Sequence, residues 1–65
     1  MFVLYDKTLF NGKERGYFNK HLWPNWSDDL DGAYGYEEDE LEDAESDRDM
    51  YNRVEGYSLE IIEIV

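Results

Sequence analysis

The chain has 65 residues, of which 17 are Asp or Glu, six are Lys or Arg, one is His and none is Cys, so its formal net charge is −11. A chain this short forms one domain at most, and without Cys it has neither disulfide bridges nor thiolate metal sites. The strong negative charge excludes attraction to nucleic acid or to anionic membranes, because both are negatively charged themselves. We therefore expect a single domain over residues 1–65 whose natural partners are basic protein surfaces.

The chain contains two Trp, six Tyr and three Phe residues, an aromatic content unlike that of disordered chains. Met1 is followed by a short apolar run and then by Asp6, so the basic start and long apolar core of a secretory signal are missing. No stretch approaches the roughly 20 apolar residues that a membrane span requires. The sequence therefore predicts a soluble, cytoplasmic protein.

Two short β-prone segments occur early in the chain, at residues 2–5 and 16–20. Between them, Asn11 and Gly12 form a strong turn signal, because both residues tolerate positive φ angles. The two segments are therefore predicted to pair as antiparallel strands. Residues 23–27 interrupt this pattern, since Pro24 cannot donate to a strand ladder. Residues 33–36 could form a third, short strand.

The hydrophobic period changes between residues 38 and 51, where the spacing predicts a helix. Its inward face contains Leu41, Ala44, Arg48 and Tyr51, and Arg48 can lie along that face on its aliphatic stem. The opposite face is almost purely acidic, and like charges four residues apart destabilise an isolated helix. This helix is therefore expected to depend on the docking of its apolar face.

The last predicted strand covers residues 57–65. Its apolar residues alternate with polar ones up to Ile61, and from Ile62 onward they occupy the opposite parity. A β-bulge, or a strand end that is buried on both faces, would explain this shift.

Together these elements predict an α+β fold: a small three- or four-stranded antiparallel sheet with one acidic helix packed on one face, in the order β-β-(β)-α-β. An exposed edge strand of such a sheet could pair two copies into a homodimer. The expected core takes apolar residues from every element, namely Val3 or Leu4, Phe18, Trp26, Ala33, Leu41, Ala44, Tyr51, Leu59 and Ile61.

Several features follow one another along most of the chain: Gly16-Tyr17-Phe18, Trp26, Asp28-Asp29, Ala33, Ala44 and the apolar segment from Tyr57 to Val65. With this run of features the chain resembles small acidic proteins encoded by bacteriophages. The resemblance implies a protein that acts in the cytoplasm of a host cell. Several members of that class act by occluding host or defence proteins, some of them as DNA mimics.

The sequence indicates no catalytic residues and no cofactor. Nucleophilic catalysis needs an activated Ser, Thr, Cys or Lys beside a base, and the chain offers few such side chains. His21 is the only side chain of the type that ordinarily transfers protons near neutrality, and it lies in a predicted exposed loop. Pairs of carboxylates could serve glycoside hydrolysis, but a chain of this length is too short to form a cleft for a sugar.

Residues 27–38 partly match the calcium-binding loop of an EF-hand. Asp29, Asp31, Gly32 and Glu38 fall at loop positions 3, 5, 6 and 12. Ser27 takes the first position, where a carboxylate normally stands, and the entering helix is missing. We therefore assign no metal ligands and keep a weak Ca²⁺-binding loop as an alternative to a simple acidic turn.

Residues 28–49 contain twelve Asp and Glu residues against Arg48 alone, so they hold the whole excess of negative charge. A net charge of about 2–8 in magnitude suffices for the solubility of a small domain, so this density suggests an external use. Carboxylates three or four residues apart on a helix lie about 5–6 Å from one another, which is comparable with the spacing of phosphates along DNA. The residues expected to substitute for phosphates in a basic cleft are Asp28, Asp29, Asp31, Glu37, Glu38, Glu40, Glu42, Asp43 and Glu45.

Tyr34 and Tyr36 lie between these acidic groups and are the expected aromatic anchors, because Tyr can stack on guanidinium groups. The leading hypothesis is an inhibitor that binds a basic host or defence protein which handles nucleic acid, such as a CRISPR effector, a nuclease, a restriction enzyme or an RNA polymerase. The alternative is a protein-interaction module that binds through its sheet and the aromatic loop around Trp23 and Trp26. In that alternative the charge serves solubility only.

Overall fold

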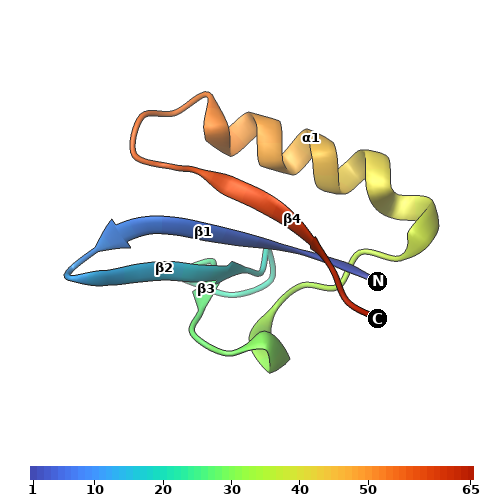
Figure 1. Cartoon of the computed structure of the whole chain (residues 1–65), viewed down its shortest axis with the longest axis horizontal. Helices are drawn as coiled ribbons and strands as arrows, with labels where there is room; N and C mark the ends of the chain where they lie inside the picture. The colour runs from blue at the N-terminus through green and yellow to red at the C-terminus, as the bar shows by residue number, and fades with distance from the viewer.

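Four antiparallel strands form the sheet of this protein, whose computed structural model describes residues 1–65 (Figure 1). β1 spans Phe2–Phe10, β2 spans Lys13–Phe18, β3 spans Trp26–Ser27 and β4 spans Leu59–Glu63. The strands lie in the order β3-β2-β1-β4, and helix α1, Leu41–Asn52, packs against β4 and β1. The predicted α+β fold, an antiparallel sheet with one helix, is confirmed.

β1 and β2 are joined by the predicted turn at Asn11 and Gly12, which have φ angles of 55° and 85°. Positive φ at both central residues is typical of a type I′ hairpin turn, which matches the twist of the flanking strands. Because the turn is so tight, β2 already begins at Lys13, earlier than the predicted start at Gly16. The hairpin therefore reaches further from the core than the sequence pattern indicates.

The third strand lies at Trp26–Ser27, and the prediction of a strand at residues 33–36 is wrong. Trp26 pairs with Phe18, and the centroids of their rings lie 5.6 Å apart. Pro24 precedes the strand, so its missing N–H does not interrupt the ladder. Residues 33–36 contribute only an isolated bridge, in which Tyr36 and Phe2 exchange two N–H···O bonds of 2.8 Å.

The helical segment begins with a 3-10 turn, η2, at Glu38–Glu40 and continues as α1. The predicted inward face of α1 is confirmed, because Ala44 is fully buried and Leu41, Arg48 and Tyr51 are half-buried. Neither α1 nor any other helix of the structure has the length and the apolar character to cross a membrane.

The core lies between the sheet and α1. Its buried apolar side chains are Leu4, Phe18, Tyr36, Ala44 and Leu59. Partly buried aromatic and aliphatic residues surround it, including the predicted core members Trp26, Tyr51 and Ile61. Two further predicted members, Ala33 and Leu41, are half-buried outside this cluster.

β4 pairs with β1 along its whole length without a shift in register. Leu59 and Ile61 face the helix, whereas Ile62 lies on the other face opposite Val3, which is fully buried. The change of parity after Ile61 therefore reflects burial on both faces of the strand, and β4 contains no bulge. The strand begins at Leu59, two residues later than predicted.

Candidate functional site

The outward face of α1 carries a row of exposed carboxylates. Glu42, Glu45 and Asp49 line a shallow concavity of about 520 Å³ along this face, and Arg53 closes it at the end of the helix. With a rise of about 1.5 Å per residue, neighbouring members of the row lie about 4.5–6 Å apart along the helix axis. Asp43 is also exposed on α1, beside this row. The helix thus exposes three of the predicted residues: Glu42 and Glu45 in this row, and Asp43 on the adjacent flank.

Two of the three predicted residues just before α1 already have partners within the protein. The Glu40 carboxylate accepts the N–H of Glu37 over 2.9 Å, which caps the 3-10 turn. A carboxylate oxygen of Glu38 lies 3.5 Å from the terminal amine of Met1. Glu37 is exposed, and so is its neighbour Asp39, which the sequence-based set omits.

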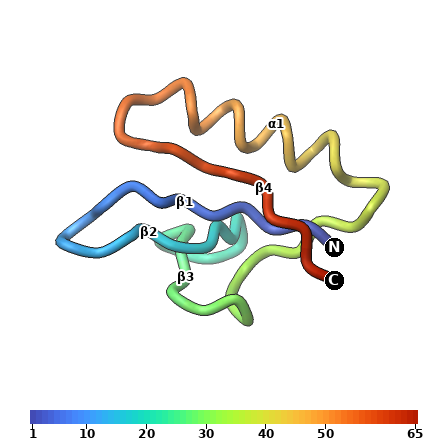
Figure 2. Tube along the Cα trace, viewed as in Figure 1, coloured from blue at the N-terminus to red at the C-terminus, as the bar shows by residue number.

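The remaining predicted acids, Asp28, Asp29 and Asp31, form a separate group beyond β3, at the edge of the sheet opposite to β4. Asp28 receives two hydrogen bonds from Lys13, of 2.8 and 3.0 Å, whereas Asp29 and Asp31 lie exposed at the short 3-10 turn η1, Leu30–Gly32. Figure 2 shows the strands between this turn and α1. The nine acids that are predicted to substitute for phosphates therefore lie in two groups. Residues 33–36 separate the two groups, because they carry the chain from β3 to the start of β1.

Tyr36 is fully buried, so the prediction that its ring is an exposed anchor is wrong. Burial, and then the hydrogen bond of 2.5 Å that its hydroxyl donates to Asp47, raise the pKa of Tyr36 above its ordinary value. Lys20 lies 3.7 Å from the same carboxylate and 4.5 Å from the centroid of the Tyr34 ring. Tyr34 itself is half-buried and packs edge-on against Tyr36. Asp47 lies three residues after Ala44, so helical spacing could have placed it on the inward face.

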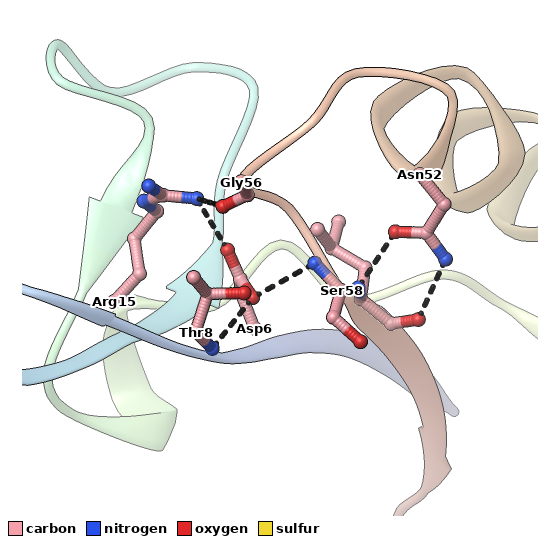
Figure 3. Close-up of polar contacts among 7 residues, drawn as sticks. Asp6, Thr8, Arg15, Asn52, Gly56 and Ser58 are labelled. Carbon is pink, nitrogen blue, oxygen red and sulfur yellow. Dashed lines mark hydrogen bonds and ion pairs between the residues drawn. The ribbon is translucent and has the colours of Figure 1, made fainter.

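A buried carboxylate that the sequence pattern did not reveal fixes the turn between α1 and β4. Asp6 is completely buried and accepts the N–H groups of Thr8 and Ser58 over 2.9 and 3.1 Å (Figure 3). Its other oxygen accepts a bond of 2.6 Å from Arg15, which also donates to the carbonyl of Gly56. Burial alone would raise the pKa of Asp6, but the hydrogen bonds from Thr8, Ser58 and Arg15 outweigh it and lower that pKa.

The side chain of Asn52 joins the last turn of α1 to the start of β4. Its oxygen accepts the N–H of Leu59 over 2.7 Å, and its nitrogen donates to the carbonyl of Leu59 over 3.0 Å (Figure 3). The amide thus satisfies backbone groups that an edge strand otherwise leaves unpaired. Together with the Asp6 contacts, it holds α1 in one position on the sheet, so the carboxylates of the outer face are presented in a fixed arrangement.

The two tryptophans differ in environment. The side chain of Trp23 is 92% exposed in the loop between β2 and β3, whereas Trp26 is half-buried between Phe18, Tyr51 and Tyr57. Trp23 is therefore the only Trp whose ring is exposed enough to contact a partner.

The residues of the calcium-loop alternative are not brought together. Asp29 and Asp31 lie at η1, whereas Glu38 lies beside the terminal amine at the start of the helical segment. No group of three or more His, Asp or Glu side chains in the structure is arranged to hold a metal ion.

Comparisons with known proteins add no further assignment. Neither a protein-family model nor a curated protein nor a solved structure matches the chain. The resemblance to phage-encoded acidic proteins therefore rests on the residues of the sequence alone.

Proposed function

We propose that this protein is a non-enzymatic inhibitor that binds a basic, nucleic-acid-handling protein through the outer face of α1 and occupies its nucleic-acid site. The observation that carries the proposal is the set Glu42, Asp43 and Glu45, all exposed on a helix that is anchored to the sheet. None of the three takes part in an ion pair within the protein. Their charge is therefore available to a partner.

The dimensions of α1 support this use. Twelve residues form a helix about 18 Å long, a length over which one strand of DNA carries about five phosphates. Carboxylates at this density can occupy positions along a cleft lined with Lys and Arg, where they accept charge-assisted hydrogen bonds. The partners that fit are CRISPR effectors, nucleases, restriction enzymes and RNA polymerases, as in the phage-encoded class that the sequence resembles.

The energetics of the helix also support an external use of the charge. Like charges at i and i+4 of an α-helix, such as Glu45 and Asp49, destabilise it by a few tenths of a kcal/mol per pair. Asp49 regains part of this through Arg48, whose Nε lies 2.9 Å away. Glu42 lies in the first turn, where a carboxylate favours the helix dipole, whereas Glu45 lies beyond that turn and has no ion pair within the protein.

The test begins with a pull-down from host lysate at low and high salt, read by mass spectrometry, followed by a competition assay of the captured protein with its nucleic acid. The triple variant Glu42→Gln, Asp43→Asn, Glu45→Gln should inhibit at least about 10-fold less, because charge-assisted contacts are worth about 1.5–3 kcal/mol each. Association should also be fast and salt-sensitive for the native protein.

A matched control removes the same number of charges from the other acidic group. The variant Asp28→Asn, Asp29→Asn, Asp31→Asn lowers the negative charge equally but leaves α1 intact. It should retain inhibition and its salt dependence. Equal loss in both triple variants would show that net charge, and not the α1 surface, is responsible.

A second candidate function is the interaction module that binds through the aromatic loop. The observation that favours it is the exposure of Trp23, since exposed Trp rings frequently anchor protein interfaces. Trp23→Ala separates the two candidates: the module loses its partner, whereas the α1-based inhibitor retains it.

A further inference from the structure

A second concavity, of about 450 Å³, lies at the hairpin end of the sheet, and none of the α1 carboxylates lines it. This volume falls within the range of about 300–1,000 Å³ that is typical of small-ligand sites. Phe10, Trp26 and Tyr57 supply its aromatic walls, and two basic residues, Lys13 and Arg15, line it together with two acidic ones, Glu14 and Asp28. The pocket therefore combines aromatic walls with balanced charges in a protein that is otherwise strongly acidic.

Arg15 is held in one orientation inside this pocket. Its side chain is only 12% exposed, and its Nη1 atom donates to Asp6 over 2.6 Å and to the carbonyl of Gly56 over 3.0 Å. The guanidinium carbon lies 4.1 Å from the centroid of the Tyr57 ring and 5.5 Å from that of Trp26. Such contacts between Arg and aromatic faces are favourable, so the group is positioned without a ligand.

The Nε–Nη2 edge of Arg15 makes no hydrogen bond within the protein. The structure contains no buried side-chain nitrogen or oxygen without a partner, so these two nitrogens are reached by solvent. Figure 3 shows them pointing away from Asp6 and Gly56. Arg15 lines the pocket, and its free edge carries two parallel N–H donors, which is the geometry that a carboxylate matches.

We infer that the pocket binds an aromatic group that carries a carboxylate, with the ring against Phe10 and Trp26 and the carboxylate on the free edge of Arg15. The same chemistry is available from a free small molecule or from an aromatic residue at the carboxyl terminus of a peptide. The inference is independent of the function proposed for α1.

The two acidic side chains that line the pocket, Asp28 and Glu14, are both engaged within the protein. Asp28 is hydrogen-bonded to Lys13, so these two charges offset each other at the site. Glu14 accepts a hydrogen bond from the hydroxyl of Tyr5. The more distant charges of α1 are screened over about 8 Å at physiological ionic strength.

The test is a titration of the labelled protein with indole-3-acetate, followed by ¹⁵N NMR. We expect saturable shifts at the indole N–H of Trp26, and an affinity for neutral indole that is at least about 10-fold lower, because the bidentate contact is missing. Equal affinities for the two probes, or no saturable shift with indole-3-acetate, would overturn the inference.

Variants of the pocket separate the contribution of the carboxylate contact from that of the aromatic contact. Arg15→Lys removes the two-donor edge and should lower the affinity for indole-3-acetate about 10-fold, with little effect on indole. Because Arg15 also pairs with Asp6, Phe10→Ala provides a second test at a ring that is 56% exposed, and it should weaken both probes. Leu9→Ala, at an exposed neighbour outside the pocket, should change neither. Unchanged binding in Arg15→Lys and Phe10→Ala would contradict the assignment.

Titration with peptides shows whether the natural ligand is a free small molecule or the carboxyl terminus of a peptide. A short peptide that ends in Trp with a free carboxylate should bind more tightly than indole-3-acetate if chain termini are the natural ligand, and less tightly if a free small molecule is. In either case the same peptide with an amidated terminus should bind at least about 10-fold less tightly than its free acid. Equal binding of the two peptides would count against the carboxylate contact.

Discussion

Asp6 occupies a position in β1 where strand alternation would place an apolar side chain against the helix. Its neighbours of the same parity include Leu4, which belongs to the core. A buried carboxylate is tolerated only when hydrogen bonds and an opposite charge replace water, and here Thr8, Ser58 and Arg15 supply them. These donors come from three segments of the chain, so Asp6 joins β1, β2 and the entry to β4.

Replacing Asp6 should therefore be costly. Asp6→Asn removes the negative charge opposite Arg15 and should lower the free energy of unfolding by about 3 kcal/mol. This is a large part of the roughly 3–10 kcal/mol expected for a domain of this length. Urea denaturation measures the loss, and Asp31→Asn, at an exposed carboxylate without an ion pair, should change stability by less than about 0.5 kcal/mol. A loss below about 1 kcal/mol in Asp6→Asn would show that the pair is not important for stability.

The same carboxylate makes stability depend on pH in acid. Because the pKa of Asp6 is lowered on folding, its contribution is complete above the unfolded-state pKa of about 3.9 and disappears as the pH falls through the folded-state value. Native protein should therefore lose stability below about pH 4. Asp6→Asn should show a flatter profile in that window. Parallel profiles of the two proteins in urea melts at several pH values would contradict this.

At the level of the elements, the position of β3 depends on a close approach between two backbones. Gly16 in β2 has a φ angle of 101°, and a Cβ atom at this residue would collide with the backbone carbonyl of Ser27 in β3. Only glycine combines this φ angle with such an approach. The residue 27 backbone can therefore pair beside Tyr17, which extends the sheet beyond β2.

Gly16→Ala should displace β3 and lower the free energy of unfolding by more than about 2 kcal/mol, since backbone strain of about 1–3 kcal/mol adds to the clash. Gly12→Ala is the matched control, because Gly12 also has a positive φ angle but open space around its Cβ position. It should cost about 1 kcal/mol, from the strained φ angle alone. Thermal or urea unfolding of both variants measures the difference, and equal losses would argue against the contact with Ser27.

Several elements follow from local pattern alone. The turn at Asn11 and Gly12, the inward face of α1 around Ala44 and the existence of a terminal strand depend on neighbours within a few residues, so the sequence predicts them. The third strand and the buried anchors Asp6 and Tyr36 were not predictable in this way. Their partners are distant in the chain, as Tyr36 is from Asp47 and Asp6 is from Ser58.

For the whole molecule, the distribution of charge opposes compactness. The chain carries a net charge of −11 within principal extents of 34 × 25 × 20 Å, so many carboxylates lie within a few Debye lengths of each other. The ion pairs of Lys7, Lys13 and Lys20 offset part of this repulsion at the surface. Such exposed pairs contribute little individually, at about 0–1 kcal/mol each.

Salt should therefore stabilise this protein. Raising NaCl from about 10 mM to about 0.5 M shortens the Debye length from about 30 Å to about 4 Å, which screens the repulsion among carboxylates. If about 1 kcal/mol is relieved, the thermal midpoint rises by about 4–8 °C for a domain of this size. The variant Glu42→Gln, Asp43→Asn, Glu45→Gln should show a smaller rise in circular dichroism melts. An unchanged or lower midpoint of the native protein in high salt would contradict this.

Local spacing and composition are sufficient to predict the class of fold, the hairpin turn, the inward face of the helix and the concentration of acids between residues 28 and 49. The separation of these acids into two groups depends on the tertiary structure, since residues 28–31 follow β3 at one edge of the sheet and α1 packs against β4 and β1 at the other. The same packing buried Tyr36 and paired Asp6 with Arg15 beside an aromatic pocket. Such contacts join side chains from separate elements, and their positions are set by the register of strands that no local pattern specifies.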